Sequence, residues 1–266
     1  MTGFRVGCGA GVVLLAALAT CAGPAGRAAA AGCPSAADAI DTDRPDVTNS
    51  SLVVPRGSLQ AENGVNLSGR GSAAALDGTN TRLRLGIADC AEVLLDAPNY
   101  SRAVRGDASS GVSDVAPAVK YQLSGLPDRV TVSAVAGLGV PTGTRPFGGD
   151  GYGPYLQVPW GAAFADGWRL AGMATAFFHP DDSRRDPTLE PTLVIGRDVD
   201  ERLDVFVEYV GDYPAAARAS HLLNSGAAFR LTPTQQIDLH VAAGLNDAAP
   251  SYVFGVGYSV RFDGLF

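Results

Sequence analysis

The sequence is short of charged residues and of methionine. Charged residues make up only 18% of its 266 residues, below the roughly 25% of an ordinary soluble domain, and there are only two methionines. Glycine occurs 33 times, and a glycine in a helix interior costs roughly 1 kcal/mol relative to alanine. This composition disfavours a helix bundle and favours β structure. The length fits one large all-β domain or two small ones.

The sequence also lacks an apolar core long enough for a membrane-spanning helix. Its most apolar run, "VVLLAALA" at 12–19, falls short of the ~20 residues that such a helix needs. The run follows Arg5 and precedes the small residues of "AGRAAAAG", which is the layout of an export signal. We predict that residues 1–31 are a signal peptide that is removed. A lipoprotein signal at Cys21 is an alternative, although the residue before it is a bulky threonine.

Positive charge is scarce once the signal is removed. The predicted signal carries Arg5 and Arg27 and no acid, so its loss takes the formal net charge from −7 to −9. Phosphates of nucleic acid call for clustered Lys and Arg, so we expect no nucleic-acid partner. The C-x-x-C spacing of zinc sites is also missing, and the sequence indicates no metal and no cofactor.

The remaining chain has a hydrophobic period of two. In "LDVFVEYV", Leu203, Val205 and Val207 fall on one face, while Asp204 and Glu208 fall on the other. Such alternation predicts strands with one apolar and one polar face. About twelve runs show it, at 59–70, 79–88, 92–100, 114–123, 129–140, 154–164, 168–178, 188–197, 202–211, 221–231, 236–245 and 252–262. An even number of strands of about ten residues is typical of a transmembrane antiparallel up-and-down β-barrel.

The predicted connections alternate in length. Short turns at 89–91, 124–128, 165–167, 198–201 and 232–235 alternate with longer loops at 71–78, 101–113, 141–153, 179–187, 212–220 and 246–251. Outer-membrane barrels have short turns on the periplasmic side and longer loops outside. We therefore predict an all-β barrel over 59–266 in the outer membrane of a Gram-negative bacterium, with outer-membrane lipids as its surroundings.

The polar faces of the strands predict the lining of the barrel. If the apolar face meets lipid, charges of both signs point inward, and such charges need pairing or water. The lumen-lining candidates are Glu62, Arg70, Arg82, Arg84, Asp96, Lys120, Arg169, Glu190, Asp204, Glu208, Arg230, Asp238, His240 and Arg261. Eight strands give a filled interior and sixteen to eighteen an open channel, so twelve predict a narrow or plugged pore.

Two cysteines remain after the predicted signal. Cys33 directly follows the signal and Cys90 lies in the first short turn, so the topology places both at the periplasmic end. In an exported chain, such a pair is most simply a disulfide, which would tie the N-terminal segment to the barrel. Two free thiols are the alternative.

Five stretches of the chain form a recognisable set of motifs. They are "DTDRPDVTNSSLVVPRGSLQAENG" at 41–64, "TRLRLGIADCAEVLLD" at 81–96, "SDVAPAVKYQL" at 113–123, "AGLGVPTG" at 136–143 and "GVGYSVRF" at 255–262. With these motifs the chain resembles the outer-membrane barrel family associated with the meta-pathway of phenol degradation. The resemblance implies a porin-like transporter that passes a small-molecule solute, hydrophobic or aromatic, and that is inserted by the barrel assembly machinery. Because "DGLF" follows the last strand, either Phe262 or Phe266 is the assembly signal.

Other functions stay open. An outer-membrane hydrolase needs a Ser-His-acid set, but the three histidines, His179, His221 and His240, lie apart and no Gly-x-Ser-x-Gly motif is present. A calcium loop at 179–186 is weakened by its two arginines. A non-conducting structural or adhesion barrel, and a soluble β-sandwich, complete the alternatives.

The segment 32–58 precedes the first strand and carries three aspartates around Arg44-Pro45. The residue before a proline avoids the helical region, so we expect an extended segment at the periplasmic rim that acts as a latch or partial plug. We expect it to pair with wall residues of that rim. The latch residues are Asp41, Asp43, Arg44 and Asp46, and the expected partners are Arg82, Arg84, Glu62 and Glu92.

Overall fold

A computed structural model describes residues 32–106, 109–124, 126–178, 187–215 and 217–266. The predicted signal peptide, with its lipoprotein alternative, and the loop 179–186 with His179 lie outside these ranges. Within the described part of the chain, no helix is long and apolar enough to cross a membrane.

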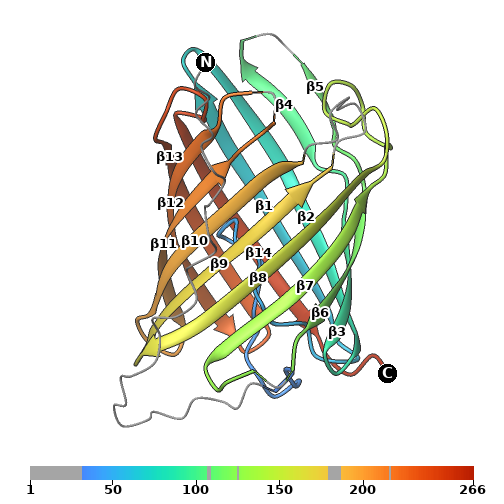
Figure 1. The fold of residues 1–266 in the computed structure, drawn as a ribbon, viewed down its shortest axis with the longest axis vertical. Coiled ribbons are helices and arrows are strands. Elements are labelled where there is room, and N and C mark those ends of the chain that lie inside the picture. The colour runs from blue at the N-terminus through green and yellow to red at the C-terminus, as the bar shows by residue number, and fades with distance from the viewer. Residues whose placement is uncertain (1–31, 107–108, 125, 179–186, 216) are drawn as a thin grey trace, which may run out of the picture.

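The described residues form fourteen strands in one sheet (Figure 1). They are β1 (Leu59–Arg70), β2 (Ala73–Ala88), β3 (Ala91–Asp96), β4 (Tyr100–Arg105), β5 (Ser110–Val112), β6 (Ala116–Gln122), β7 (Val130–Gly139), β8 (Gly153–Ala165), β9 (Trp168–Phe177), β10 (Thr188–Asp198), β11 (Leu203–Asp212), β12 (Ser220–Thr232), β13 (Gln235–Gly244) and β14 (Tyr252–Phe262).

The sheet closes on itself. Strand β1 pairs antiparallel with both β2 and β14, so the sheet has no break between its first and last strands. Strand β2 pairs along its length first with β4 and then with β3, and β4 and β3 pair in turn with β5 and β6. Strands β3 and β4 together therefore take one strand position in the wall, and β5 and β6 together take the next. The result is a closed antiparallel barrel of twelve strands, which confirms the predicted fold class.

Two predicted loops are wrong. We expected a loop at 71–78, but β2 begins at Ala73, and Leu67 of β1 pairs with Leu76 of β2. The two strands are joined by a two-residue turn whose Gly71 has a φ of 57°, a value that glycine adopts readily in tight hairpins. Residues 101–113, also predicted as a loop, contain most of β4 and all of β5.

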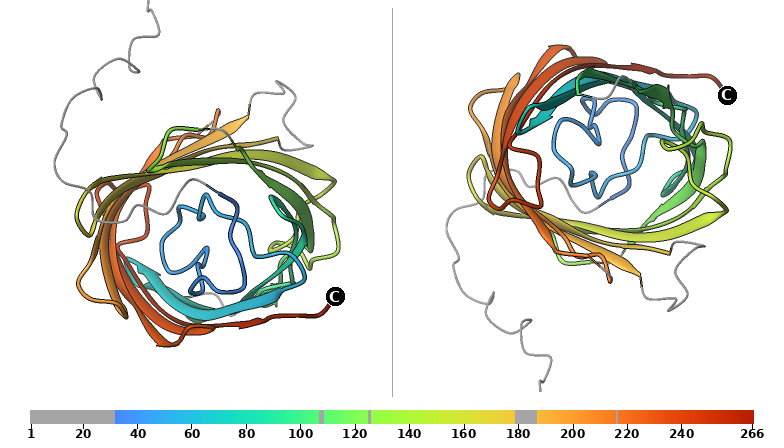
Figure 2. Two further views of the ribbon diagram at one scale, coloured as in Figure 1. Left: turned by 90° about the horizontal axis from the view of Figure 1, so that it is seen from below. Right: turned by 90° about the horizontal axis from the view of Figure 1, so that it is seen from above.

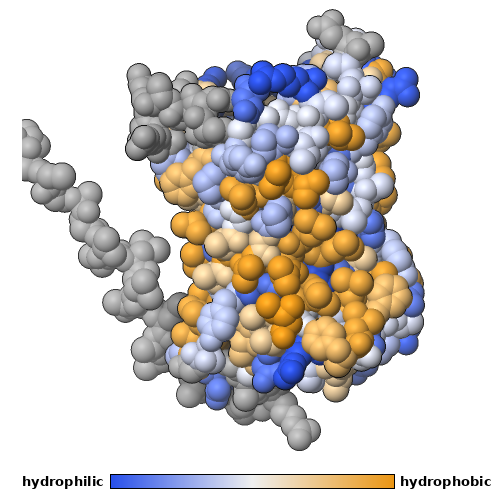
Figure 3. Space-filling model, turned by 90° about the vertical axis from the view of Figure 1, so that its right-hand side faces the viewer, coloured by the Kyte–Doolittle hydropathy of each residue, from blue (hydrophilic) through white to orange (hydrophobic). Residues whose placement is uncertain are grey.

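The two faces of the wall differ sharply in polarity. Large apolar side chains lie exposed on the outside, among them Val256 and Leu239, and hydrophobic residues form a band across the face seen in Figure 3. Polar side chains such as Glu62, Arg84 and Lys120 are fully buried inside. An apolar exterior around a polar interior is the arrangement of a barrel whose solvent outside is lipid.

Residues 33–58, which we call the inner segment, lie mostly inside the barrel (Figure 2), while residues 35–39 are exposed at the short-turn end. The structure places most of this segment deeper than expected, because it occupies the lumen instead of staying at the rim. A disulfide joins Cys33 to Cys90 in the turn between β2 and β3, with a Cα–Cα distance of 5.2 Å. At its other end the segment continues directly into β1. Both ends are thus held at the short-turn end, which in outer-membrane barrels faces the periplasm.

Candidate functional site: the occupied lumen

The inner segment has almost no regular secondary structure, and wall side chains bind its backbone instead. Glu208 of β11 accepts hydrogen bonds from the backbone N–H groups of Val47 at 2.9 Å and Thr48 at 2.8 Å. Glu92 of β3 accepts from the N–H of Val54 at 2.5 Å. Buried N–H groups need partners, so inward-facing carboxylates take the place of a neighbouring strand.

Asp43 is the most heavily paired residue of the inner segment. Its carboxylate lies 3.0 Å from Arg82, 3.2 Å from Arg84 and 3.4 Å from Lys120. It also accepts the N–H of Ser50 at 2.9 Å, which fixes the turn of the segment. Asp43, Arg84 and Lys120 are almost wholly buried inside the barrel, where an unpaired charge is costly.

Arg44 extends toward the seam where the barrel closes. Its guanidinium lies 3.2 Å from Asp238 of β13. It fits against Gly64 of β1 and Gly257 of β14, which face each other across the seam, and a side chain at either glycine would overlap with it. The two glycines therefore make the space that the arginine occupies.

The latch residues make only some of the pairings expected from the sequence. Asp43 binds Arg82 and Arg84 as expected, but Arg44 turns to Asp238 instead of Glu62 or Glu92. The backbone carbonyl of Asp41 accepts hydrogen bonds from Gln60 at 2.7 Å and Arg84 at 3.3 Å. Asp46 lines a cavity between the inner segment and the barrel wall.

The other lumen-lining candidates lie on inward-facing positions of their strands. Five of them take part in four side-chain ion pairs: Asp96 with Arg82 at 2.6 Å, Arg169 with Asp198 at 2.6 Å, Arg230 with Asp204 at 2.5 Å and Arg261 with Asp263 at 2.8 Å. Arg70 binds backbone carbonyls at the long-loop rim, Glu190 is half-buried, and His240 lies between two asparagines. The structure does not bring these groups together into one site.

Sequence reasoning missed Asp77, which collects three amides. It accepts hydrogen bonds from Asn66 at 3.2 Å, Asn80 at 2.7 Å and Asn99 at 3.2 Å. Asp77 lies in the stretch that we expected to be a loop, so it was not assigned an inward face. The signal that could have found it is Asp77 itself, a polar residue that lies opposite the inward-facing Asn66 when β1 and β2 pair as a hairpin.

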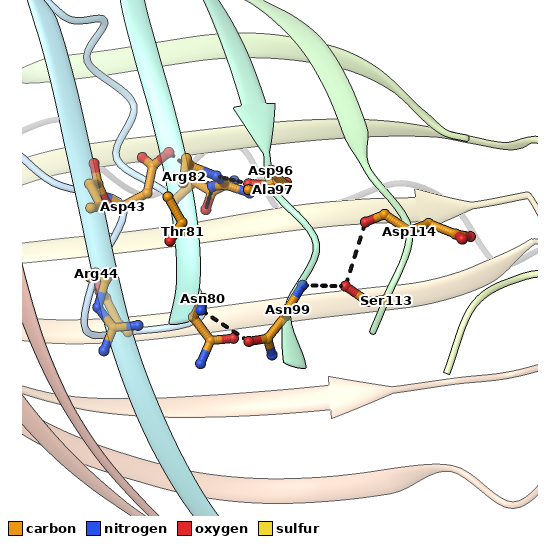
Figure 4. A pocket seen from close by; sticks show the side chains of 13 residues that line it. Asp43, Arg44, Asn80, Thr81, Arg82, Asp96, Ala97, Asn99, Ser113 and Asp114 are labelled. Carbon is orange, nitrogen blue, oxygen red and sulfur yellow. Dashed lines mark hydrogen bonds and ion pairs between the residues drawn. The ribbon is translucent and has the colours of Figure 1, made fainter. Parts of the chain in front are cut away.

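A cavity of about 290 Å³ lies between the inner segment and the wall of β2 and β3 (Figure 4). Its lining is almost wholly polar. The inner segment contributes Asp43, Arg44, Asp46 and Asn49, and the wall contributes Glu62, Asn80, Thr81, Arg82, Asp96, Ala97, Asn99, Ser113 and Asp114. A second cavity, of about 590 Å³, adjoins the disulfide at the short-turn end.

The tail after β14 is held at the short-turn end as well. Asp263 accepts hydrogen bonds from Arg261 at 2.8 Å and from the Ser58 hydroxyl at 2.7 Å. Burial alone would raise the pKa of the Asp263 carboxyl, but these hydrogen bonds and the positive charge of Arg261 outweigh burial and lower the pKa. The end of the inner segment and the end of the chain are thus linked. No group of three or more His, Cys, Asp or Glu side chains placed to hold a metal occurs in the described ranges.

Comparison with known families decides what kind of barrel this is. The model of the family "Putative MetA-pathway of phenol degradation" matches residues 42–262. The chain belongs to this family. The match begins within the inner segment and runs to the end of β14. No curated protein sequence matches the chain.

Solved structures of the same fold are outer-membrane channels. An outer-membrane channel from Pseudomonas putida F1 is 15% identical over 84% of this chain and 100% of its own, with a TM-score of 0.64. The KdgM porin in complex with disordered oligogalacturonate is 9% identical over 77% of this chain and 99% of its own, with a TM-score of 0.54. The NanC porin is 11% identical over 77% and 100%, with a TM-score of 0.52. This family member is therefore an outer-membrane β-barrel with a porin-like fold.

Proposed function

We propose that this barrel mediates the passive passage of small aromatic or hydrophobic compounds across the outer membrane. The observation that carries the proposal is the cavity of about 290 Å³ inside a barrel whose fold matches outer-membrane channels. The family description, which names phenol degradation, supports an aromatic solute. No chemical step is assigned to the barrel.

The cavity chemistry favours aromatic compounds that carry a hydroxyl group. The cavity lining combines acceptors, such as the carboxylate of Asp46, with donors, such as the side-chain amides of Asn49 and Asn80. A hydroxyl both donates and accepts a hydrogen bond, so a phenol suits this combination. A hydrocarbon ring of the same size leaves these polar groups unpaired, which is costly.

Uptake by whole cells tests the proposal. The chain is expressed in Gram-negative cells that lack their own general porins, and the initial uptake of radiolabelled phenol and toluene is measured against an empty vector. We expect faster phenol uptake with the chain, a smaller gain for toluene, and a reduced phenol gain in Asp46→Asn. Asp200→Asn, in an exposed turn, is the matched control. Equal uptake with and without the chain would reject transport.

A second candidate function is a non-conducting structural barrel. The many contacts between the inner segment and the wall favour this function. The segment binds side chains on β1, β2, β11 and β13, which lie around the lumen. Planar bilayer recording separates the two functions. A structural barrel gives no conductance in the wild type and an open pore only after Pro34–Ser51 is deleted, whereas a transporter conducts with the inner segment in place.

A further inference from the structure

His240 lies between two asparagine side chains in the lumen wall. It projects inward from β13, and its Nδ1 is 3.1 Å from Oδ1 of Asn224 on β12. Its Nε2 is 3.2 Å from Oδ1 of Asn66 on β1. The ring reaches across β14 because residue 255 there is a glycine, and any side chain at Gly255 would overlap with the imidazole.

The orientation of both amides is fixed from their far sides. Nδ2 of Asn224 donates to Glu208 at 2.9 Å, and Nδ2 of Asn66 donates to Asp77 at 3.2 Å. Since each NH2 group faces a carboxylate, each amide must turn its oxygen to His240. A neutral imidazole has one N–H donor and one acceptor. Both contacts are therefore hydrogen bonds only when the ring carries two N–H groups and a positive charge.

The two carboxylates that bind these amides also bind the inner segment and residues of the cavity wall. Glu208 binds the backbone of Val47 and Thr48 and so fastens the inner segment. Asp77 binds Asn80 and Asn99, which line the cavity. When the ring carries both N–H groups, one unbroken chain of hydrogen bonds runs from the cavity wall through His240 to the inner segment.

Charged groups of both signs surround the ring. Asp77 on β2 and Glu208 on β11 stand behind the two amides, and Asp238 lies two residues away on β13 itself. The inner segment contributes the cationic Arg44, which is paired with Asp238. The facing position on β14 is Gly255 and adds no charge.

We propose that His240 is a positioning residue that makes the docking of the inner segment depend on proton concentration. When the ring loses a proton, one of its nitrogens faces an amide oxygen as acceptor to acceptor. One amide must then turn over, and either Glu208 or Asp77 loses a donor. The inner segment or the cavity wall loosens as a result. Any effect of His240 on transport rests on the proposed function, but its effect on the docking of the inner segment does not.

Thiol labelling measures docking without any need for conduction. In Thr48→Cys, the new thiol replaces a buried hydroxyl beside the backbone N–H that Glu208 binds, while Cys33 and Cys90 are joined and do not react. Labelling rates are compared between about pH 5 and about pH 8, which lie on either side of the ordinary pKa of histidine. Each rate is divided by the rate of the unfolded protein at the same pH, which corrects for the fraction of thiolate. Loss of one hydrogen bond to a charged group predicts a corrected rate that is about tenfold higher at the upper pH.

Two histidine variants decide whether His240 is responsible. In the Thr48→Cys background, His240→Gln is expected to abolish the pH dependence, because glutamine does not titrate. His221→Gln, at an outward-facing histidine that binds Tyr209, is expected to keep it. Heat-modifiable gel migration checks that each variant folds.

A pH-independent rate in Thr48→Cys itself, or an unchanged pH dependence in His240→Gln, overturns the proposal. Bilayer recording of the same proteins separates this result from the fate of the proposed function. Absent conductance at every pH rejects transport, while pH-dependent labelling in the same samples still supports His240.

Discussion

Replacing Asp43 by asparagine is expected to loosen the inner segment. The carboxylate of Asp43 is the only charge that the segment places against the wall cations Arg82, Arg84 and Lys120. Asparagine keeps the size of the side chain and one oxygen, so the backbone N–H of Ser50 keeps its acceptor. What changes is the charge, and with it three ion pairs.

The size of the effect follows from how the wall balances its own charges. Removing one partner of a buried ion pair costs about 3–5 kcal/mol when the other is left uncompensated. Here the three wall cations also pair with three wall carboxylates, Glu62, Glu92 and Asp96. No cation is left alone, so we expect the lower end, about 3 kcal/mol, which is about a hundredfold in the undocked fraction.

Single-channel recording checks this prediction directly. The Asp43→Asn protein should show open events about a hundred times more often than the wild type, since undocking clears the lumen. Asp41→Asn is the matched control, because Asp41 contacts the wall through its backbone carbonyl. Identical traces for Asp43→Asn and the wild type, with both proteins folded, would refute the idea that these ion pairs hold the segment.

Three further changes probe other parts of the barrel. Gly257→Ala should displace Arg44 from the seam and raise the open probability, whereas Gly153→Ala, where the added methyl group has room, should not; bilayer recording compares them. Cys90→Ser should lower the free energy of unfolding by up to about 4 kcal/mol, because the disulfide closes a loop of 57 residues; urea titration in lipid vesicles measures this, and an unchanged midpoint would contradict it. Val256→Arg, on the exposed apolar face of β14, should cost about 2–4 kcal/mol in the same titration, and a loss below 1 kcal/mol would place this residue outside the lipid.

The barrel wall was predictable from the sequence because a strand has a period of two. Once a run such as Leu203–Asp212 is recognised, parity alone assigns Asp204 and Glu208 to the lumen. Parity gives no information on contacts that cross the lumen. The pairing of Arg44 with Asp238 joins residues 194 positions apart, and it depends on the space left by Gly257, which reads in the sequence only as one more glycine in a strand.

The conformation of the inner segment could not be predicted from the sequence, for a deeper physical reason. Amphipathic strands and helices satisfy their backbone N–H groups with partners of their own kind, and their side-chain pattern records which face is buried. The inner segment satisfies its backbone with the side chains of Glu62, Glu92 and Glu208, which belong to distant strands. The residues that specify the conformation of the inner segment therefore lie in the wall and not in the segment itself. Substitutions of these glutamates should loosen the inner segment as strongly as substitutions within it.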